Sequence, residues 1–376
     1  MSDGYRVLSL FDGMGCAHLA MQGAGLQVER YVAFEVDRFC NEAVAHNFPD
    51  AERRGDVFDA DFTEFEGFDF LMGGSPCTYW SVAQSADRRE TTASGVGWEL
   101  FQQYVRALRE ARPRWFIYEN NKSMSRAIRD SISAEFGFEP VWINSALVSA
   151  QKRDRLYWVG RREEDGTYSQ VPVGQPADRG LLLRDVLETG TDLTGRDKSY
   201  ALTATYDGAV PWNTIERNQR SMVAEPVATA PMRVGGLPTK DGSGVSTSQS
   251  ARIYSTEGKS VTLQSGQNTG GGRGALTGLY AVPASAASVP VYEVRGGEIE
   301  IQGRRYPIRL PDGKYIIRKL SVRECMRLQT VPEWYDFSCV SNTQAYKMLG
   351  NGWTVEVIVH LLRSIMEGEE DAGSGD

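Results

Sequence analysis

The chain has 376 residues, of which 41% are apolar and 24% charged, and its formal net charge is −8 at pH 7. That length is enough for two domains or for one domain with a large insertion. The sequence contains neither the run of roughly 18 apolar residues that a membrane span needs nor a basic and apolar signal segment at its start, so we expect a cytoplasmic protein without a membrane partner.

The cysteines, histidines and charges narrow the possible partners. Five scattered cysteines without CxxC spacing and only three histidines argue against a disulfide framework and against a metal site. The acidic net charge does not favour nucleic acid, but residues 181–310 alone carry more basic than acidic side chains. This is compatible with a phosphate-binding face in that region and, equally, with a random distribution of charge.

Predicted strands and helices alternate over the first 160 residues. The expected strands, which are short apolar, β-branched or aromatic runs, are 7–11, 31–36, 68–72, 115–118, 141–148 and 155–159. The expected helices are 17–24, 38–48, 99–111 and 123–136. This alternation is typical of an α/β fold with a doubly wound, mostly parallel sheet, whose ligands bind at the carboxyl ends of the strands.

The character of the sequence changes after about Gly160. Residues 165–310 are rich in Gly, Ser, Thr and Pro and have no helical periodicity, which predicts a loop-rich segment with short strands. Helical periodicity returns after Leu320, where Ser321 and Glu324 have the spacing of a capping box. A long helix over 343–366, interrupted near Gly350, is expected to precede a disordered acidic tail over 367–376.

Three features at the ends of the first strands indicate a nucleotide-like ligand. A glycine turn, FDGMG, follows the first strand, and Glu35 ends the second strand about 20 positions later. Nucleotide-binding folds place a close-approaching turn and a ribose-binding carboxylate with this spacing. Asp56, in GDV, could serve an adenine amino group in the same way. Each feature alone is also compatible with an ordinary surface turn.

The stretch GGSPC, ending in Cys77, presents a thiol at the same edge of the sheet. Cysteine is a ready nucleophile at neutral pH when its surroundings lower its pKa. The following strand ends at Glu119, which brings a carboxyl group to that edge. No histidine lies near Cys77 in the sequence, which argues against a cysteine protease. The residues therefore predict a thiolate, a carboxyl group and a nucleotide-like ligand at one site.

These residues belong to eight blocks that resemble the DNA cytosine-5 methyltransferases and occur in that family's order. The blocks are LSLFDGMG, FEVD, GDV, GGSPC, YENN, QKRDR, RKLSVRECMRLQTVP and LGNGW. LFDG and GGSPC look most like the branch with the de novo methyltransferases of animals and many phage or bacterial relatives. The resemblance implies a Rossmann-like class I methyltransferase fold, with a catalytic domain over 1–175 and 315–366 and an inserted, mainly β target recognition domain over 176–314.

The resemblance also implies a mechanism. Cys77 matches the nucleophile that adds to carbon 6 of a flipped cytosine, after which carbon 5 accepts the methyl group of S-adenosylmethionine. Glu119 matches the carboxyl group that acts on ring nitrogen 3. Arg153 matches the first arginine of the QKRDR block, which stabilises the activated base, and Arg155 is assigned to the same catalytic set.

Ligand-binding residues are carried over by position. The S-adenosylmethionine pocket is expected to comprise Phe11, Asp12, Gly13, Gly15, Glu35, Val36, Asp56, Val57, Pro76, Leu100, Asn351 and Trp353. Candidate contacts to double-stranded DNA are Gln151, Arg252, Lys259 and Arg273, although a solvated surface charge is the commoner role for each of the last three. We expect a monomer.

Departures from the family pattern leave the donor and the substrate open. The family usually has ENV where this chain has Asn121 after Glu119-Asn120. A buried amide needs partners, which a local hydrogen bond or a more polar donor, such as a carboxylated analogue of S-adenosylmethionine, could supply. The same blocks also suit an RNA cytosine methyltransferase or a catalytically silent relative, although the intact Cys77 argues against the latter. A role in restriction–modification, in phage defence or as an orphan enzyme is left open.

Overall fold

The computed structural model describes residues 4–81, 87–227, 233–236, 252–255, 279–281 and 290–373. Its main sheet has the strand order β3-β2-β1-β4-β5-β7-β6, with β8 paired to β7. The strands are β1 (Tyr5–Leu10), β2 (Val28–Phe34), β3 (Glu52–Arg54), β4 (Phe70–Gly73), β5 (Trp115–Asn121), β6 (Val141–Asn144), β7 (Asp154–Arg162) and β8 (Tyr168–Gln170). β1 to β5 are parallel to one another, whereas β7 runs against both β5 and β6. The doubly wound, mostly parallel sheet predicted from the sequence is confirmed.

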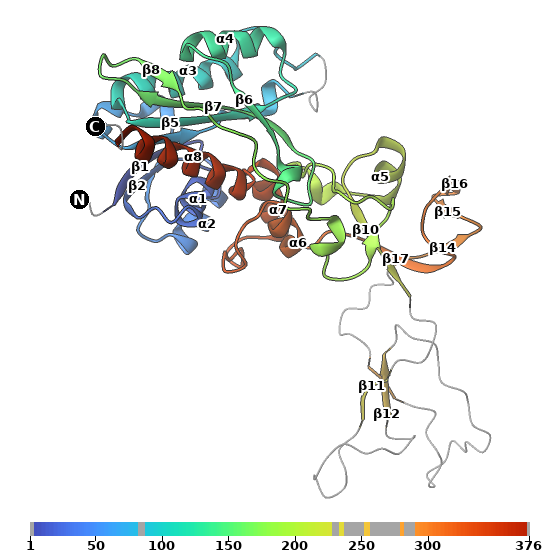
Figure 1. Ribbon diagram of the computed structural model, residues 1–376. Coiled ribbons are helices and arrows are strands. Elements are labelled where there is room, and N and C mark those ends of the chain that lie inside the picture. The colour runs from blue at the N-terminus through green and yellow to red at the C-terminus, as the bar shows by residue number, and fades with distance from the viewer. Residues whose placement is uncertain are drawn as a thin grey trace, which may run out of the picture.

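Helices cover both faces of this sheet (Figure 1). They are α1 (Cys16–Gly23), α2 (Arg38–Asn47), α3 (Val96–Ala111), α4 (Arg126–Phe136) and the C-terminal α8 (Val355–Gly373). One apolar core joins the sheet to α1, α2 and α8, and a second joins it to α3 and α4. In α3, the residues at helical spacing are all buried, namely Phe101, Tyr104, Val105 and Leu108. They form the apolar face that packs against the sheet.

A second, antiparallel sheet forms the insertion. Its order is β16-β15-β14-β17-β10-β9, and three short strands, β11 (Arg233–Gly236), β12 (Arg252–Ser255) and β13 (Leu279–Ala281), form a third sheet (Figure 1). The strands of the second sheet are β9 (Thr191–Asp192), β10 (Met222–Pro226), β14 (Val291–Arg295), β15 (Glu298–Ile301), β16 (Arg304–Pro307) and β17 (Gly313–Lys319). The expected boundary between residues 314 and 315 falls inside β17, which pairs with both β10 and β14. β17 therefore belongs to the second sheet as far as Lys319.

Short helical segments complete the architecture. The α-helices not yet named are α5 (Pro211–Arg217), α6 (Val322–Leu328) and α7 (Asn342–Asn351). The 3-10 helices are η1 (Val57–Asp59), η2 (Phe62–Phe65), η3 (Cys77–Tyr79), η4 (Ser145–Leu147), η5 (Leu183–Asp185) and η6 (Tyr206–Gly208). Among the described residues, no helix is both long and apolar enough to cross a membrane.

The C-terminal segment returns to the main sheet, with one departure from expectation. The capping box is present, and the helical pattern breaks at Gly352 between α7 and α8. However, α8 continues to Gly373, so the prediction of disorder from residue 367 is wrong for residues 367–373. Near the end of this helix, Glu369 forms an ion pair with Arg114, the residue before β5.

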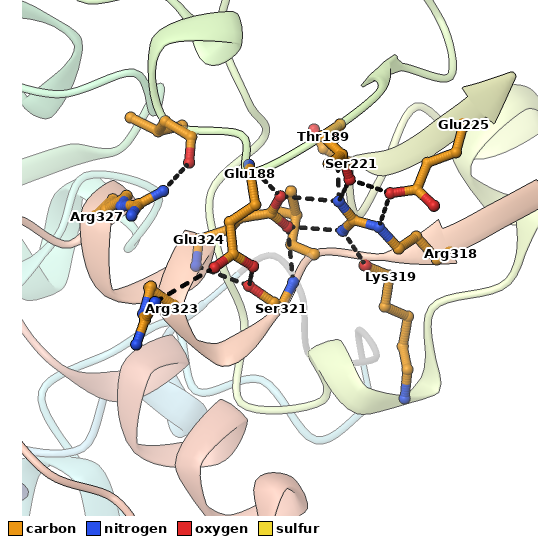
Figure 2. Close-up of polar contacts among 12 residues, drawn as sticks. Glu188, Thr189, Ser221, Glu225, Arg318, Lys319, Ser321, Arg323, Glu324 and Arg327 are labelled. Carbon is orange, nitrogen blue, oxygen red and sulfur yellow. Dashed lines mark hydrogen bonds and ion pairs between the residues drawn. The ribbon is translucent and has the colours of Figure 1, made fainter. Parts of the chain in front are cut away.

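A buried carboxylate connects the insertion to α6 (Figure 2). Glu324 has no exposed surface and accepts hydrogen bonds from Arg318 Nη1 at 2.8 Å and Nη2 at 3.0 Å. It also accepts from the backbone N–H groups of Glu188 at 2.8 Å and Ser321 at 2.7 Å. Arg318 Nε in turn pairs with Glu225 of β10 at 2.7 Å. A buried charge is tolerated only when fully partnered, so this network ties β10 and β17 to α6.

Candidate active site

A cavity of about 370 Å³ opens at the carboxyl ends of the parallel strands and is also bordered by α7 and the α7–α8 connection. Its lining includes the predicted catalytic residues Cys77, Glu119, Arg153 and Arg155. It also includes every predicted cofactor residue except Gly15, namely Phe11, Asp12, Gly13, Glu35, Val36, Asp56, Val57, Pro76, Leu100, Asn351 and Trp353. Residues from opposite ends of the chain therefore meet in one cavity.

The glycine turn shapes one wall of the cavity. Gly13 and Gly15 have left-handed φ angles of 61° and 78°, which glycine adopts without steric penalty. The Gly13 N–H donates to Glu35 Oε2 at 2.9 Å, and the Asp37 N–H donates to Glu35 Oε1 at 2.8 Å. Gly15 lies outside the lining, as the N-cap of α1, where an added Cβ would come 3.1 Å from the Phe48 ring. It shapes the turn and does not border the cavity.

Asp12 is a buried carboxylate with one unused oxygen. Its Oδ1 accepts hydrogen bonds from Ser9 Oγ at 2.6 Å and from Tyr31 Oη at 2.5 Å. Its Oδ2 has no partner among the described residues. Burial raises the pKa of Asp12 to about 6, against the lowering effect of the two hydrogen bonds. A cationic ligand group beside Asp12 would supply the missing interaction.

The loop after β4 packs Gly74 against Glu119 and carries Cys77 into the cavity lining. Cys77 begins η3, and its half-buried side chain lines the cavity. A Cβ added at Gly74 would lie 2.7 Å from the Glu119 carbonyl oxygen and 3.0 Å from its Oε2. Only glycine permits this approach of the two segments, which accounts for the small residues before Pro76.

Two side chains hold the carboxylate of Glu119. Glu119 is only 9% exposed; its Oε1 pairs with Arg155 Nε at 2.8 Å, and its Oε2 accepts a hydrogen bond from Trp353 Nε1 at 2.9 Å. Arg155 comes from β7, next to β5 in the sheet, whereas Trp353 comes from the α7–α8 connection. The carboxylate is therefore oriented before any substrate binds.

Arg153 lines the cavity, and backbone carbonyls bind its guanidinium group. Its Nη1 donates to the carbonyl of Leu202 at 3.0 Å, and its Nη2 donates to the carbonyls of Gly350 at 3.1 Å and Gly352 at 2.8 Å. Burial lowers the pKa of Arg153 to about 10, so the group stays protonated near neutral pH. These nitrogens bind backbone carbonyls, whereas Arg155 pairs with the Glu119 carboxylate.

The structure contradicts the assignment of Gln151 as a DNA contact. Gln151 has no exposed surface. Its amide donates to the Leu328 carbonyl at 3.2 Å and to Gln329 Oε1 at 3.1 Å, and its Oε1 accepts from the Leu202 N–H at 2.6 Å. It therefore fastens the insertion to the end of α6. The side chain of Arg252, in β12, and the whole of Lys259 and Arg273 lie outside the described residues.

Asn121 does not support a modified donor. It is 4% exposed and is absent from the cavity lining. Its Oδ1 accepts from Ser123 Oγ at 2.6 Å, and its Nδ2 donates to Asn120 Oδ1 at 3.2 Å. Local hydrogen bonds therefore satisfy the amide.

Two further lining residues, Phe58 and Lys347, fall just outside the sequence blocks that predict the site. Lys347 precedes Asn351 by four positions, so helical spacing is the signal that places both on one face of α7. Phe58 follows Val57 directly and is 49% exposed. Among the described residues, no group of three His, Cys, Asp or Glu side chains is arranged to hold a metal ion.

Comparison with known proteins agrees with this geometry. The family model for C-5 cytosine-specific DNA methylases matches residues 5–367. The chain belongs to this family. It is 25% identical to the orphan methyltransferase M.SPRI of Bacillus phage SPR, over 96% of this chain and 97% of the relative. It is also 25% identical to the type II methyltransferase M.HhaI of Haemophilus parahaemolyticus, over 96% and 94%.

Solved structures of similar fold include proteins named as methyltransferases. The Entamoeba histolytica methyltransferase EhMeth aligns with a TM-score of 0.56 at 11% identity, covering 98% of this chain and 99% of that one. A Spodoptera frugiperda DNMT2 variant aligns with a TM-score of 0.53 at 14% identity, covering 96% and 99%. At this identity the likeness shows the Rossmann-like fold and its accompanying sheet.

Proposed function

We propose that this family member is a DNA cytosine-5 methyltransferase that uses S-adenosylmethionine and takes its target cytosine out of the DNA stack. The observation that carries the proposal is the position of Glu119. Its carboxylate is held by Arg155 and Trp353 at the cavity that Cys77 also lines. A nucleophile and an oriented carboxyl group are what addition to a pyrimidine ring requires.

The residues of the cavity fit S-adenosylmethionine. A volume of about 370 Å³ is in the range of small-ligand pockets. Glu35, anchored by two backbone N–H groups, retains lone pairs for the ribose hydroxyls. The exposed side chains of Val36 (71%) and Phe58 (49%) offer apolar surface for adenine, and the unpaired Oδ2 of Asp12 suits a cationic group. When bound, S-adenosylmethionine supplies an electrophilic methyl group.

The protein groups then act on the cytosine ring. The Cys77 thiolate forms a bond to carbon 6, while the carboxyl group of Glu119 hydrogen-bonds ring nitrogen 3 and draws charge from the ring. Carbon 5 thereby becomes nucleophilic and accepts the methyl group. Loss of the proton from carbon 5 and cleavage of the bond between sulfur and carbon 6 restore the aromatic ring and the free thiolate.

Arg153 serves this chemistry by positioning. It binds the carbonyls of Gly350 and Gly352, which flank Asn351 and precede Trp353. The connection that supplies the hydrogen bond to Glu119 is thereby fixed against β7. We assign residues 1–175 and 320–373 to the catalytic domain, and residues 176–319 to a target recognition domain that binds double-stranded DNA. The phage and bacterial relatives, which are named as orphan and type II methyltransferases, support DNA as the substrate.

A covalent trap tests the proposal. Duplex DNA of mixed sequence containing 5-fluorocytosine is incubated with labelled S-adenosylmethionine and the full chain. We expect a methylated protein–DNA adduct with the wild type and with Cys339→Ala, which removes an exposed thiol, but none with Cys77→Ala. An adduct that persists in Cys77→Ala, or that transfer RNA suppresses more effectively than duplex DNA, would contradict the proposal.

A further inference from the structure

A second hollow of about 330 Å³ lies beyond the end of β5 and shares no lining residue with the catalytic cavity. Lys122, Arg126 and Arg129 line it, opposed by Glu139 as the one carboxylate in the lining. Three cationic side chains and one carboxylate are therefore present in the lining. Its charge suits an anionic partner.

The hollow is close to the catalytic groups. Lys122 follows Glu119 by three residues, which at about 3.3 Å per residue places its backbone within roughly 10 Å of Glu119 along the chain. The loop that carries Lys122 also contacts the segment after Cys77, because Ser125 Oγ donates to the Thr91 carbonyl at 2.5 Å. The surface therefore adjoins the segment around Thr91 and the end of β5, the strand that carries Glu119.

Trp142 fixes the position of the Lys122 ammonium group. Lys122 Nζ lies 3.6 Å from the centroid of the Trp142 ring, a favourable cation–π contact. The ring is 45% exposed, and its Nε1 donates to Asp154 Oδ1 at 2.8 Å. Asp154 also accepts from Asn144 Nδ2 at 3.2 Å and stands between Arg153 and Arg155 in the sequence. β7 therefore carries both Asp154, which binds the Trp142 ring, and Arg155, which pairs with Glu119.

The ammonium group of Lys122 is free to bind an external anion. Lys122 is exposed and has no carboxylate partner among residues 4–81, 87–227 and 290–369. Nearby, Asp130 pairs with Arg126 and Arg129, and Asp154 is engaged by Trp142. A lysine already held against a ring loses less side-chain entropy when it binds a phosphate.

We propose that Lys122, positioned by Trp142, binds a backbone phosphate of the DNA strand that carries the flipped cytosine. The inference rests on the proposed function. A flipped nucleotide stays attached to its strand, so the phosphates on either side of it remain at the mouth of the catalytic cavity. Lys122 supplies the phosphate contact and Trp142 is a positioning residue.

Salt-dependent binding tests the phosphate contact. Loss of one phosphate contact makes the slope of log K against log salt less steep by about 0.9. The loss of affinity relative to the wild type is therefore about eightfold greater at 0.1 M salt than at 1 M. We expect this change for Lys122→Gln, and a change in the same direction for Trp142→Leu. The double variant is expected to bind DNA as tightly as the single variant with the lower affinity, because Trp142 acts through Lys122. Lys122→Arg keeps the positive charge, so it is expected to retain the wild-type slope.

Arg114→Gln is the matched control. Arg114 lies over Trp115 at 4.1 Å, just before β5 and at the opposite edge of the sheet from Glu119, so its loss is expected to leave the slope unchanged. An unchanged slope for Lys122→Gln, or additive losses in the double variant, overturns the inference while the proposed function stands. If the wild type forms no Cys77 adduct with duplex DNA, the proposed function itself fails and the inference with it.

Discussion

The indole Nε1 of Trp353 donates a hydrogen bond to Glu119 Oε2 at 2.9 Å, although the two residues lie 234 positions apart in the chain. This contact joins the α7–α8 connection to the end of β5. It closes the catalytic cavity around a carboxylate that Arg155 holds from the other side. The cavity is therefore complete only when the α7–α8 connection lies against the main sheet.

Replacing Trp353 with Phe is expected to lower kcat. The ring keeps its apolar volume but loses the N–H donor, so the Glu119 carboxylate keeps Arg155 as its one side-chain partner and can rotate. Hydrogen bonds to charged groups contribute roughly 1.5–3 kcal/mol, which corresponds to a fall in kcat of about ten- to a hundredfold. Steady-state kinetics with duplex DNA measure it. Trp334→Phe, at a 53% exposed position, is the control, and equal losses in both variants would contradict the role of the hydrogen bond.

Affinity for S-adenosylmethionine is expected to fall as the pH drops through about 6, because Asp12 has its pKa raised to about 6. Above that pH the carboxylate is ionised and attracts a cationic ligand, whereas below it the group is neutral. The Tyr31 hydrogen bond lowers the pKa of Asp12, so Tyr31→Phe is expected to move the midpoint to higher pH. Calorimetric titration between pH 5 and pH 8 measures both. A midpoint that is the same in Tyr31→Phe would argue against Asp12 as the titrating group.

The raised pKa of Asp12 also predicts that the ionised carboxylate lowers the stability of the fold while it favours ligand binding. The folded state binds the Asp12 proton more tightly than the unfolded state, whose pKa is near 3.8. This contribution to stability is therefore fully present below about pH 4 and is lost as the pH rises through about 6. At pH 7, Asp12→Asn is expected to raise the free energy of unfolding by up to about 3 kcal/mol and to weaken S-adenosylmethionine binding. A variant that unfolds more easily than the wild type would contradict this.

Gly74→Ala is expected to abolish activity. The added Cβ would lie 2.7 Å from the Glu119 carbonyl oxygen, so the loop that carries Cys77 must move away from β5. Overpacking of this kind costs about 1–3 kcal/mol of stability, which leaves a folded protein for assay. Gly174→Ala, where the new Cβ meets nothing within 4 Å, is the control. Adduct formation with fluorocytosine DNA measures the effect, and a wild-type adduct yield in Gly74→Ala would refute it.

The parts of the site that follow from local order could be predicted from the sequence. Cys77 and Glu119 come at the ends of neighbouring parallel strands, and such strands deliver these residues to one edge of a sheet. The glycine turn and Glu35 likewise follow two neighbouring parallel strands, β1 and β2. For these residues, sequence position alone determines which edge of the sheet they reach.

The errors concern polar side chains whose partners are distant in the sequence. Gln151 is predicted to contact DNA, yet it is buried and donates a hydrogen bond to the Leu328 carbonyl. Arg153, predicted to stabilise the activated base, is also buried and donates to the carbonyls of Leu202 and Gly350. Those carbonyls lie 49 to 197 positions away, so no local pattern reveals them. Glu369, near the end of α8, likewise pairs with a distant residue, Arg114, which lies 255 positions away.

The network around Glu324 (Figure 2) yields a prediction about stability. Glu324→Gln removes the buried negative charge and leaves Arg318 with Glu225 as its one acidic partner. Breaking a buried pair typically costs about 3–5 kcal/mol, since an uncompensated charge remains. The exposed pair of Arg295 and Glu293 is the control, because Glu293→Gln is expected to change stability by less than about 1 kcal/mol. Urea denaturation of both variants measures the difference. If the two lost equal stability, the carboxylate of Glu324 would not be what fastens the second sheet to α6.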